Sequence, residues 1–525
     1  MISKSTGAAL VGVDARRVEV EVEFALGLPA LSLIGLGDAA VQEAKFRIQS
    51  ALRASGVELP HKKITINLAP ADLRKDGSGL DLPMALGVLG AIGAVDPNQL
   101  RTLLSAAELG LGGDLRPIRG ALAVAALAKS LGMESVVLPP DNAAEAGLVQ
   151  GVARIAPKTL RDLIEHLRGQ SSALVTGQAE LAAPTPSTLD LSQIQGQPAA
   201  RRALEIAAAG AHNLFMVGPP GGGKTMLARR LPTILPPLAA AERIEVTKIW
   251  SAAGLTQGAQ AVVSERPFRA PHHTTSDVAL IGGGSPIRPG EVSLAHRGVL
   301  FLDELPEFRR SALETLRQPL EDREVSLARA RHFVRLPAAF MLVAAANPCP
   351  CGYRGDPAHR CACSVEQVSR YLGRLSGPLL DRIDMSLEVP AVQPEELLRG
   401  APGESSARVR QRVFRARERA EARGWGTNAA CSGAEIRRGA ELAPGAEELL
   451  LKAIRGLQLS ARAVDRSLKV ARTIADLQDE KLVTSAALAE ALRYRPPLER
   501  FRPALVELPS LEARAADHPR KELSR

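Results

Sequence analysis

The sequence predicts an α/β protein with a parallel sheet at its centre and a helical region near its C-terminal end. Two stretches indicate the sheet. Residues 214–217 are apolar and run directly into a glycine-rich loop, and residues 299–302 are apolar and run directly into two acids. Short apolar runs that end this way are typical of buried parallel strands. From residue 435 to about 494, apolar residues instead recur at helical spacing.

The loop after the first strand carries the clearest chemical signal. Residues 218–225 read Gly-Pro-Pro-Gly-Gly-Gly-Lys-Thr and are followed by a helix-compatible run. The phosphate-binding pattern G-x-x-x-x-G-K-[ST] has this form, which favours it over a plain turn. We expect Lys224 to reach the β- and γ-phosphates of ATP and Thr225 to hold Mg²⁺. The expected nucleotide-binding residues are Gly218, Pro219, Pro220, Gly221, Gly222, Gly223, Lys224, Thr225 and Met226.

Two later strands end in polar residues that suit ATP hydrolysis. The run 299–302 ends at Asp303 and Glu304. We expect Asp303 to bind the Mg²⁺–water cluster and Glu304 to act as the general base on the attacking water. A further predicted strand, 340–345, precedes Asn347, which we expect to orient water at the γ-phosphate.

Several arginines are candidates for the charge that stabilises the transition state. Arg382 lies in Leu-Leu-Asp-Arg-Ile-Asp, which resembles the arginine-finger motif of ring ATPases, and Arg374 is the second candidate. Near the C-terminal end, Arg462 is preferred over Arg466 as the sensor of the helical lid. The alternative for the arginine-finger motif is a helix-capping salt bridge, and the alternative for Arg462 or Arg466 is a solvated basic face.

The N-terminal residues 1–168 also show α/β patterning. Residues 74–86, with 112–120 and 137–142, resemble the proteolytic domain of Lon-type proteases, which use a Ser–Lys dyad. Here the alignment places Gly79 at the nucleophile position and Leu122 at the lysine position. Ser78 is a neighbouring hydroxyl without an evident lysine to activate it. We therefore expect a Lon-like domain without peptidase activity.

Residues 190–500 resemble AAA+ ATPases, and several segments make the resemblance more specific. They are residues 266–277, 282–296, 305–308, 318–322 and 347–353. This pattern resembles the magnesium-chelatase-like ComM/YifB family, and the resemblance covers nearly the whole chain. It implies hexameric rings that act as DNA helicases and promote branch migration in homologous recombination during natural transformation.

The same resemblance predicts two insertions in the ATPase core. One is the glycine-rich element 281–291. The other is a β-hairpin before the sensor strand, where 324–327 and 332–336 alternate like two strands. In a ring both would face the pore, so Arg329, Arg331 and His332 could contact DNA phosphates without reading bases. A solvated hairpin tip is the alternative.

Four of the five cysteines are close together in the sequence. Cys349 and Cys351 form one Cys-x-Cys pair, and Cys361 and Cys363 form another across a loop rich in Gly, Arg, Asp and Pro. Four thiolates suit tetrahedral Zn²⁺, which would also order a loop that has little core of its own. Free thiols and disulfides are the alternatives, and His359 is a substitute ligand.

Composition agrees with a cytoplasmic protein that binds an anionic partner. The 525 residues carry a net charge of +9, which favours nucleic acid, although a solvated basic surface is the blander interpretation. No signal peptide or membrane span is expected. The alternative functions are a magnesium-chelatase subunit and an ATP-dependent protease or scaffold. The expected divisions are a Lon-like domain (1–168), a linker (169–190), an AAA+ core (191–395), a helical lid (396–500) and a tail (501–525).

Overall fold

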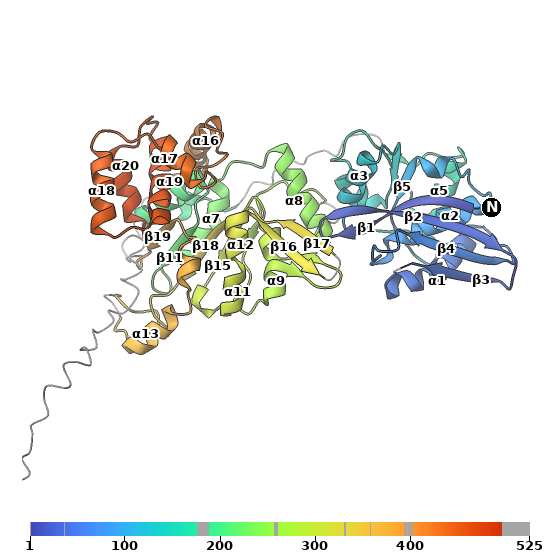
Figure 1. Cartoon of the computed structure of the whole chain (residues 1–525), viewed down its shortest axis with the longest axis horizontal. Coiled ribbons are helices and arrows are strands. Elements are labelled where there is room, and N and C mark those ends of the chain that lie inside the picture. Colours follow the sequence, from blue (N-terminus) through green and yellow to red (C-terminus); the bar gives the residue numbers. More distant parts are fainter. Residues whose placement is uncertain are drawn as a thin grey trace, which may run out of the picture.

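The computed structural model describes residues 2–35, 37–175, 188–256, 261–329, 332–356, 359–392, 396 and 403–495. These residues form an N-terminal α/β part, a central α/β part and a C-terminal helical part (Figure 1). The predicted α/β class, with a parallel central sheet and a helical C-terminal region, is confirmed. Residues 176–187 of the predicted linker, Arg331 and the predicted tail 501–525 lie outside the described residues.

The N-terminal part is built on one mixed sheet in the order β10-β9-β8-β5-β1-β2-β4-β3. Its centre is the long antiparallel pair β1–β2, against which the wholly buried helix α2 packs. The strands are β1 (Ile2–Val11), β2 (Asp14–Ala25), β3 (Ala30–Ile34), β4 (Lys63–Ala69), β5 (Leu103–Ser105), β8 (Ser135–Val137), β9 (Ala153–Ile155) and β10 (Leu174–Val175), with a separate pair β6 (Glu108–Leu109) and β7 (Leu115–Arg116). The helices are α1 (Ala39–Ala54), α2 (Asp81–Ala91), α3 (Ala121–Ser130), α4 (Ala143–Ala146) and α5 (Leu160–Leu167).

The central part holds a parallel sheet in the order β12-β15-β18-β11-β19. Because all five strands run the same way, the loops at their carboxyl ends meet at one edge, where α/β proteins bind ligands. These strands are β11 (Leu214–Val217), β12 (Phe268–Arg269), β15 (Val299–Leu302), β18 (Met341–Ala346) and β19 (Met385–Glu388). Two small ribbons accompany them, β13 (Gly282–Gly283) with β14 (Arg288–Pro289), and β16 (Glu324–Arg329) with β17 (His332–Pro337).

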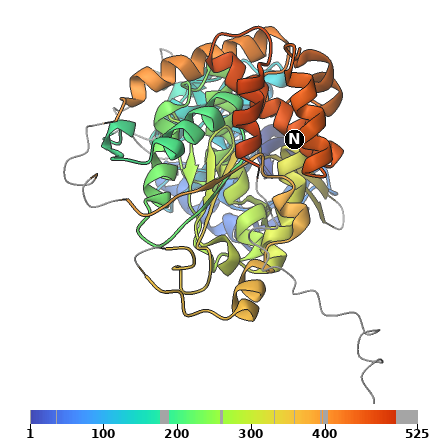
Figure 2. The same ribbon diagram turned by 90° about the vertical axis from the view of Figure 1, so that its left-hand side faces the viewer.

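Helices cover the central sheet and form the C-terminal part. Around the sheet lie α6 (Pro198–Gly210), α7 (Lys224–Ile234), α8 (Ala240–Ala253), α9 (Asp277–Ile281), α10 (Glu291–Leu294), α11 (Arg310–Thr315), α12 (Arg317–Asp322), α13 (Val365–Leu372) and α14 (Gly377–Leu380). The C-terminal helices are α16 (Ser406–Ala422), α17 (Gly433–Gly439), α18 (Ala446–Gly456), α19 (Ala461–Leu477) and α20 (Ser485–Arg493). They gather on one side of the core in Figure 2, where α16 and α19 pack against α6. None of the described helices combines the length and apolarity that crossing a membrane requires.

The turn between β1 and β2 packs against the central part and forms a contact between the two parts. Val13 is buried in the same apolar cluster as Val334 and Leu336 of β17. Gly12 lies so close to Val334 that a side chain at Gly12 would overlap it. Next to this contact, Asp14 forms an ion pair with Lys248 of α8. The hairpin β16–β17 is therefore packed directly against the N-terminal part, beside the end of β1 (Figure 1).

Candidate nucleotide site and cysteine cluster

The phosphate loop joins the end of β11 to the start of α7. Gly223 (φ +86°) is the residue before α7, and Gly221 (φ +78°) also has the left-handed conformation that glycine adopts most readily. A side chain at Gly218 would overlap the carbonyl oxygen of Val389, which follows β19. The glycines thus allow the loop to curl over the sheet edge and place the N-terminus of α7 beneath it.

Lys224 lies inside this loop rather than in solvent. It is 8% exposed, and its Nζ donates to the carbonyl oxygens of Gly218 at 2.6 Å and Pro219 at 2.9 Å. A third bond, of 3.2 Å, goes to Oδ1 of Asn347 at the end of β18. Burial lowers the pKa of Lys224, and the nearby carboxylates of Asp303 and Glu304 act in the opposite direction. Phosphate oxygens in the loop would take over the contacts to the ammonium group.

The two oxygens expected to hold Mg²⁺ are next to each other. Oγ1 of Thr225 donates to Oδ2 of Asp303 at 2.7 Å, which joins the first turn of α7 to the end of β15. Hydroxyl, carboxylate and phosphate oxygens are the ligands that Mg²⁺ prefers, so this pair fits the ion. The structure thus brings Lys224, Thr225, Asp303 and Asn347 together from three neighbouring strand ends.

Glu304 follows Asp303 in the left-handed backbone region, with φ of +51°. Its backbone N–H donates to Oδ1 of Asp303 at 3.0 Å, and its carboxylate projects outward with a side-chain exposure of 53%. Nδ1 of His273 lies 3.4 Å from Oε2 of Glu304. An exposed carboxylate at this sheet edge can come within hydrogen-bond reach of a water molecule, which a general base needs.

His273 is a site residue that sequence reasoning did not single out. It forms a ring contact with His272, with centroids 4.1 Å apart, and an edge contact with Phe308 at 6.5 Å. The available signal was the His-His pair at 272–273, which lies within the family-matching segment 266–277. Since β12 is parallel to β15, the segment after β12 arrives at the same sheet edge as Glu304.

Arg382 lies at the opposite, amino edge of the sheet. Its carbonyl accepts from Nδ2 of Asn213, the residue before β11, at 3.0 Å. Its guanidinium contacts Glu321 at 2.6 Å, the carbonyl of Pro378 at 2.6 Å and the carbonyl of Arg317 at 3.2 Å. Arg382 and the phosphate loop therefore occupy opposite ends of β11 in one chain.

The other arginine candidates occupy different places. Arg374 contacts Glu307 at 2.8 Å and the carbonyl of Pro306 at 3.1 Å, just after the strand-end acids. Arg462 is exposed in the first turn of α19. Arg466, one turn later, lies 3.8 Å from Asp384, and burial lowers its pKa.

Arg382 and Arg466 line the same cavity at the amino edge of the sheet, and Arg462 does not. The cavity has a volume of about 370 Å³. Basic side chains dominate its charged lining: Arg266, Arg297, Arg323, Arg382, Arg417, Arg466 and Lys469 accompany the acids Glu242, Glu321 and Asp384. This edge therefore presents positive charge at a distance from the chain's own phosphate loop.

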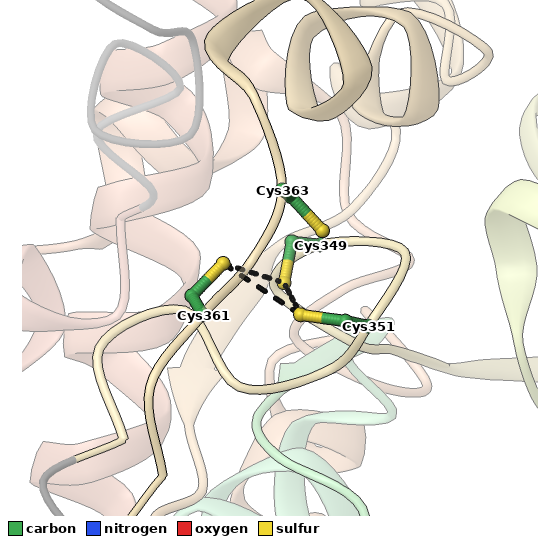
Figure 3. A group of neighbouring side chains, drawn as sticks. All are labelled: Cys349, Cys351, Cys361 and Cys363. Atoms are coloured by element: carbon green, nitrogen blue, oxygen red, sulfur yellow. Dashed lines mark hydrogen bonds between the residues drawn. The ribbon is translucent and has the colours of Figure 1, made fainter.

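The cysteine cluster begins two residues after Asn347. Sγ of Cys349 is 3.4 Å from that of Cys351 and 3.7 Å from that of Cys361, and the last two are 3.6 Å apart (Figure 3). With Cys363, the four sulfur atoms lie within 4.8 Å of one another. Burial raises the pKa of Cys349 to about 12, whereas the backbone N–H groups of Tyr353 and Ala362 lower that of Cys351 to about 6.

The predicted hairpin before β18 is present as β16–β17. Val334 and Leu336 are buried, whereas Phe333 and Arg335 between them are exposed. The Arg335 guanidinium lies over the Phe333 ring, 5.4 Å from its centroid. Arg329 and His332 pair through the backbone at the described end of the hairpin. Phe333 and Arg335 form an outward face that sequence reasoning missed, although the alternation in 332–336 contained it.

In the N-terminal part, the hydroxyl of Ser78 bonds to Glu108. Lys75 is fully buried, and its ammonium group donates to the carbonyls of Leu68, at 3.1 Å, and Pro70. Within the described residues, no lysine is hydrogen-bonded to Ser78. The absence of peptidase activity stays a prediction.

Comparison with known proteins covers all three parts. A model described as "Magnesium chelatase, subunit ChlI" matches residues 190–397, "Subunit ChlI of Mg-chelatase" matches 20–142, and "Magnesium chelatase, subunit ChlI C-terminal" matches 403–495. The competence protein ComM of Haemophilus influenzae is 44% identical over 494 residues, 93% of this chain and 96% of ComM. The chain belongs to the ComM/YifB family of magnesium-chelatase-like proteins.

Two further members of the ComM/YifB family show the same extent of similarity. The uncharacterized protein YifB of Escherichia coli is 44% identical over 495 residues, again 93% of this chain and 96% of that protein. An uncharacterized protein of Mycobacterium tuberculosis is 45% identical over 501 residues, 94% of this chain and 98% of that protein. Membership implies ATP and Mg²⁺ as cofactors and suggests ATPase activity.

Proposed function

We propose that the protein is the subunit of a hexameric, ATP-driven DNA motor of the cytoplasm. In this proposal it is a helicase that promotes branch migration in homologous recombination during natural transformation. The name of the similar competence protein ComM supports the pathway, and the grouped Lys224, Thr225, Asp303 and Asn347 support ATP hydrolysis. ATP and Mg²⁺ are the cofactors of the motor, and Zn²⁺ at the cysteine cluster is the third that we propose.

The observation that carries the motor proposal is the connection between the hairpin and the nucleotide site. β17 leads through three residues into β18, and β18 ends next to Asn347, which contacts Lys224. A change at the γ-phosphate can therefore be passed along one strand to the hairpin. The outward Phe333 and Arg335 suit this role, since aromatic rings stack on bases and arginines contact phosphates irrespective of sequence.

The chemistry of hydrolysis is divided among the chain's own residues. Lys224 would neutralise the β- and γ-phosphates, while Thr225 and Asp303 would hold Mg²⁺, which neutralises developing charge. Glu304, directed by His273, would remove a proton from the attacking water. We place Arg382 opposite the γ-phosphate of a neighbouring subunit, because it lies at the far end of β11 from its own phosphate loop.

The decisive experiment measures ATP hydrolysis with and without branched DNA, followed by branch migration of a four-way junction. The wild-type protein should be stimulated and should migrate the junction, and Lys224→Ala should do neither. Phe333→Ala with Arg335→Ala should reduce the ratio of stimulated to basal hydrolysis by about tenfold, given the ~1–3 kcal/mol of each stacked base.

The N-terminal part offers a matched control for the hairpin variant. Phe46 is as exposed as Phe333, at 62%, and Lys45 lies over its ring at 5.1 Å. Lys45→Ala with Phe46→Ala should leave the stimulation ratio unchanged. Equal losses in both double variants would remove the hairpin from the proposal, and a wild-type protein insensitive to DNA would overturn the motor.

A magnesium-chelatase subunit is the second candidate, because the matching family models carry that description. It predicts ATP hydrolysis that does not respond to DNA and supports magnesium insertion into a porphyrin. An ATP-dependent protease or scaffold is the third. For the protease, a peptidase signal abolished by Ser78→Ala would be required.

A further inference from the structure

The spacing of the four sulfur atoms in Figure 3 distinguishes a metal site from disulfides. The separations of 3.4, 3.6 and 3.7 Å among Cys349, Cys351 and Cys361 far exceed the ~2.05 Å of a disulfide bond. Four ligands at the Zn–S distance of about 2.3 Å form a tetrahedron whose edges are roughly 3.8 Å. Cys349, Cys351 and Cys361 therefore have the sulfur spacing of a tetrathiolate centre, and the sulfur of Cys363 lies within 4.8 Å of the other three.

The substitute ligand suggested by the sequence is directed elsewhere. Nδ1 of His359 contacts Oδ2 of Asp356 at 3.1 Å, and its ring packs on Tyr353 with centroids 4.7 Å apart. The His359 side chain is 61% exposed. Cys363 instead completes the group of four sulfur atoms.

We propose that Cys349, Cys351, Cys361 and Cys363 bind one Zn²⁺ ion in a closed, four-coordinate site. Four thiolates with no open position match structural rather than catalytic zinc. A tetrahedral set of four sulfur ligands is shared with iron centres, so the metal's identity is part of the test.

The position of the site gives the ion a second role, which is to position Asn347 for ATP hydrolysis. This role rests on the proposed ATPase activity. Cys349 follows Asn347 by two residues, and Cys363 immediately precedes Ser364, the N-cap of α13. Between them, a β-carbon at Gly352 would lie 2.6 Å from Cδ of Pro220 in the phosphate loop. The ion thus joins the strand that carries Asn347 to α13 and holds the intervening loop against the phosphate loop. The four cysteines act as positioning residues for Asn347.

The first measurement is metal content and thiol count in wild-type protein purified without chelators. We expect about one zinc per chain, no stoichiometric iron or copper, and no disulfide by mass spectrometry after alkylation without reduction. Cobalt exchanged for zinc should show the absorption of tetrahedral thiolate coordination. Zinc near zero, iron or copper at one per chain, or a disulfide among these four cysteines would each overturn the site.

Variants test which residues bind the ion. Cys361→Ser with Cys363→Ser should lose the zinc, whereas Cys363→His should retain it because histidine is also a zinc ligand. Cys431→Ser is the matched control, since Cys431 is buried and its Sγ bonds to the carbonyl of Asn428 at 3.1 Å. Full zinc content in the double serine variant would refute the assignment, and the wild-type measurement decides the matter if that variant does not fold.

The positioning role has its own readout, basal ATP hydrolysis without DNA. The double serine variant should bind ATP within about threefold of the wild type but turn it over about tenfold more slowly, since a 1.4 kcal/mol loss at the transition state is tenfold in rate. Unchanged kcat after zinc loss would refute the positioning role and leave the metal site standing. Because neither measurement uses DNA, a failure of the motor proposal is separate from both.

Discussion

Mixing two inactive variants tests whether the nucleotide site is shared between subunits. Arg382→Ala leaves the phosphate loop intact, and Lys224→Ala leaves the arginine intact. Each pure variant should hydrolyse ATP about 10³-fold more slowly than the wild type, the lower end of what an arginine supplied in trans contributes. In a ring with head-to-tail interfaces, a mixed assembly re-creates complete sites wherever an Arg382→Ala subunit receives the arginine of a Lys224→Ala neighbour.

The contacts of Arg382 give the free energy needed to release its side chain for a neighbouring subunit. Leaving its present place breaks two hydrogen bonds to carbonyls, worth about 1 kcal/mol each, and one ion pair with the half-exposed Glu321, worth about 1 kcal/mol. Release therefore costs about 3 kcal/mol. A gain of 10³–10⁵ in rate corresponds to about 4–7 kcal/mol, so contact with a neighbour's γ-phosphate would more than offset the release.

The assay is steady-state ATP hydrolysis at constant total protein while the ratio of the two variants changes. With random assembly at equal amounts, about one interface in four is complete, so about a quarter of the wild-type rate should return. Circular dichroism and size-exclusion chromatography must show that both variants fold and assemble. A mixture that stays at the basal rate, with assembly intact, would assign Arg382 to its own subunit and refute the shared site.

Three further predictions concern residues that the structure places close to the site or the domain junction. Glu304→Gln should bind ATP with wild-type affinity but hydrolyse it at least about 100-fold more slowly in single-turnover assays; a smaller loss would assign the general base elsewhere. Tyr371→Phe removes a buried hydroxyl beside the backbone N–H of Asn347 and should lower kcat about fivefold without changing ATP affinity, whereas parallel losses in both would indicate general unfolding. The carboxylate of Glu145 accepts a hydrogen bond from Thr256 at 3.0 Å across the domain junction. Burial raises the pKa of Glu145, so the folded protein loses stability as the pH rises above the ordinary pKa of glutamate and the buried carboxyl group must ionise. Glu145→Gln should therefore raise the melting temperature more at about pH 8 than at about pH 5, and an equal effect at both would contradict the burial argument.

The elements with strong local signals were predictable. The apolar runs 214–217 and 299–302 form β11 and β15, and the two halves of the predicted hairpin form β16 and β17. The glycines, lysine and acids at strand ends also predicted that the expected nucleotide-binding residues lie at one sheet edge, because the carboxyl ends of parallel strands share that edge. These features depend on short-range periodicity and on a fixed connection rule.

Other features depend on which segments meet in space. β1 (Ile2–Val11) contains serines, a lysine and a glycine, so its pattern did not indicate a strand, yet pairing with β2 and β5 holds it at the centre of the sheet. The contact between His273 and Glu304 joins residues 31 positions apart. The burial of Arg382 against Glu321 likewise depends on α12, and no motif in the sequence encodes it.

The β1–β2 turn has a mechanical consequence for any movement of the hairpin. Val13 shares one buried cluster with Val334 and Leu336, and interiors packed at this density shift as blocks rather than deform smoothly. A stroke of the hairpin must therefore either carry the N-terminal part with it or expose this apolar contact to water. In the first case the whole N-terminal part moves together with the hairpin. In the second case the free energy of exposing this apolar contact opposes each movement of the hairpin.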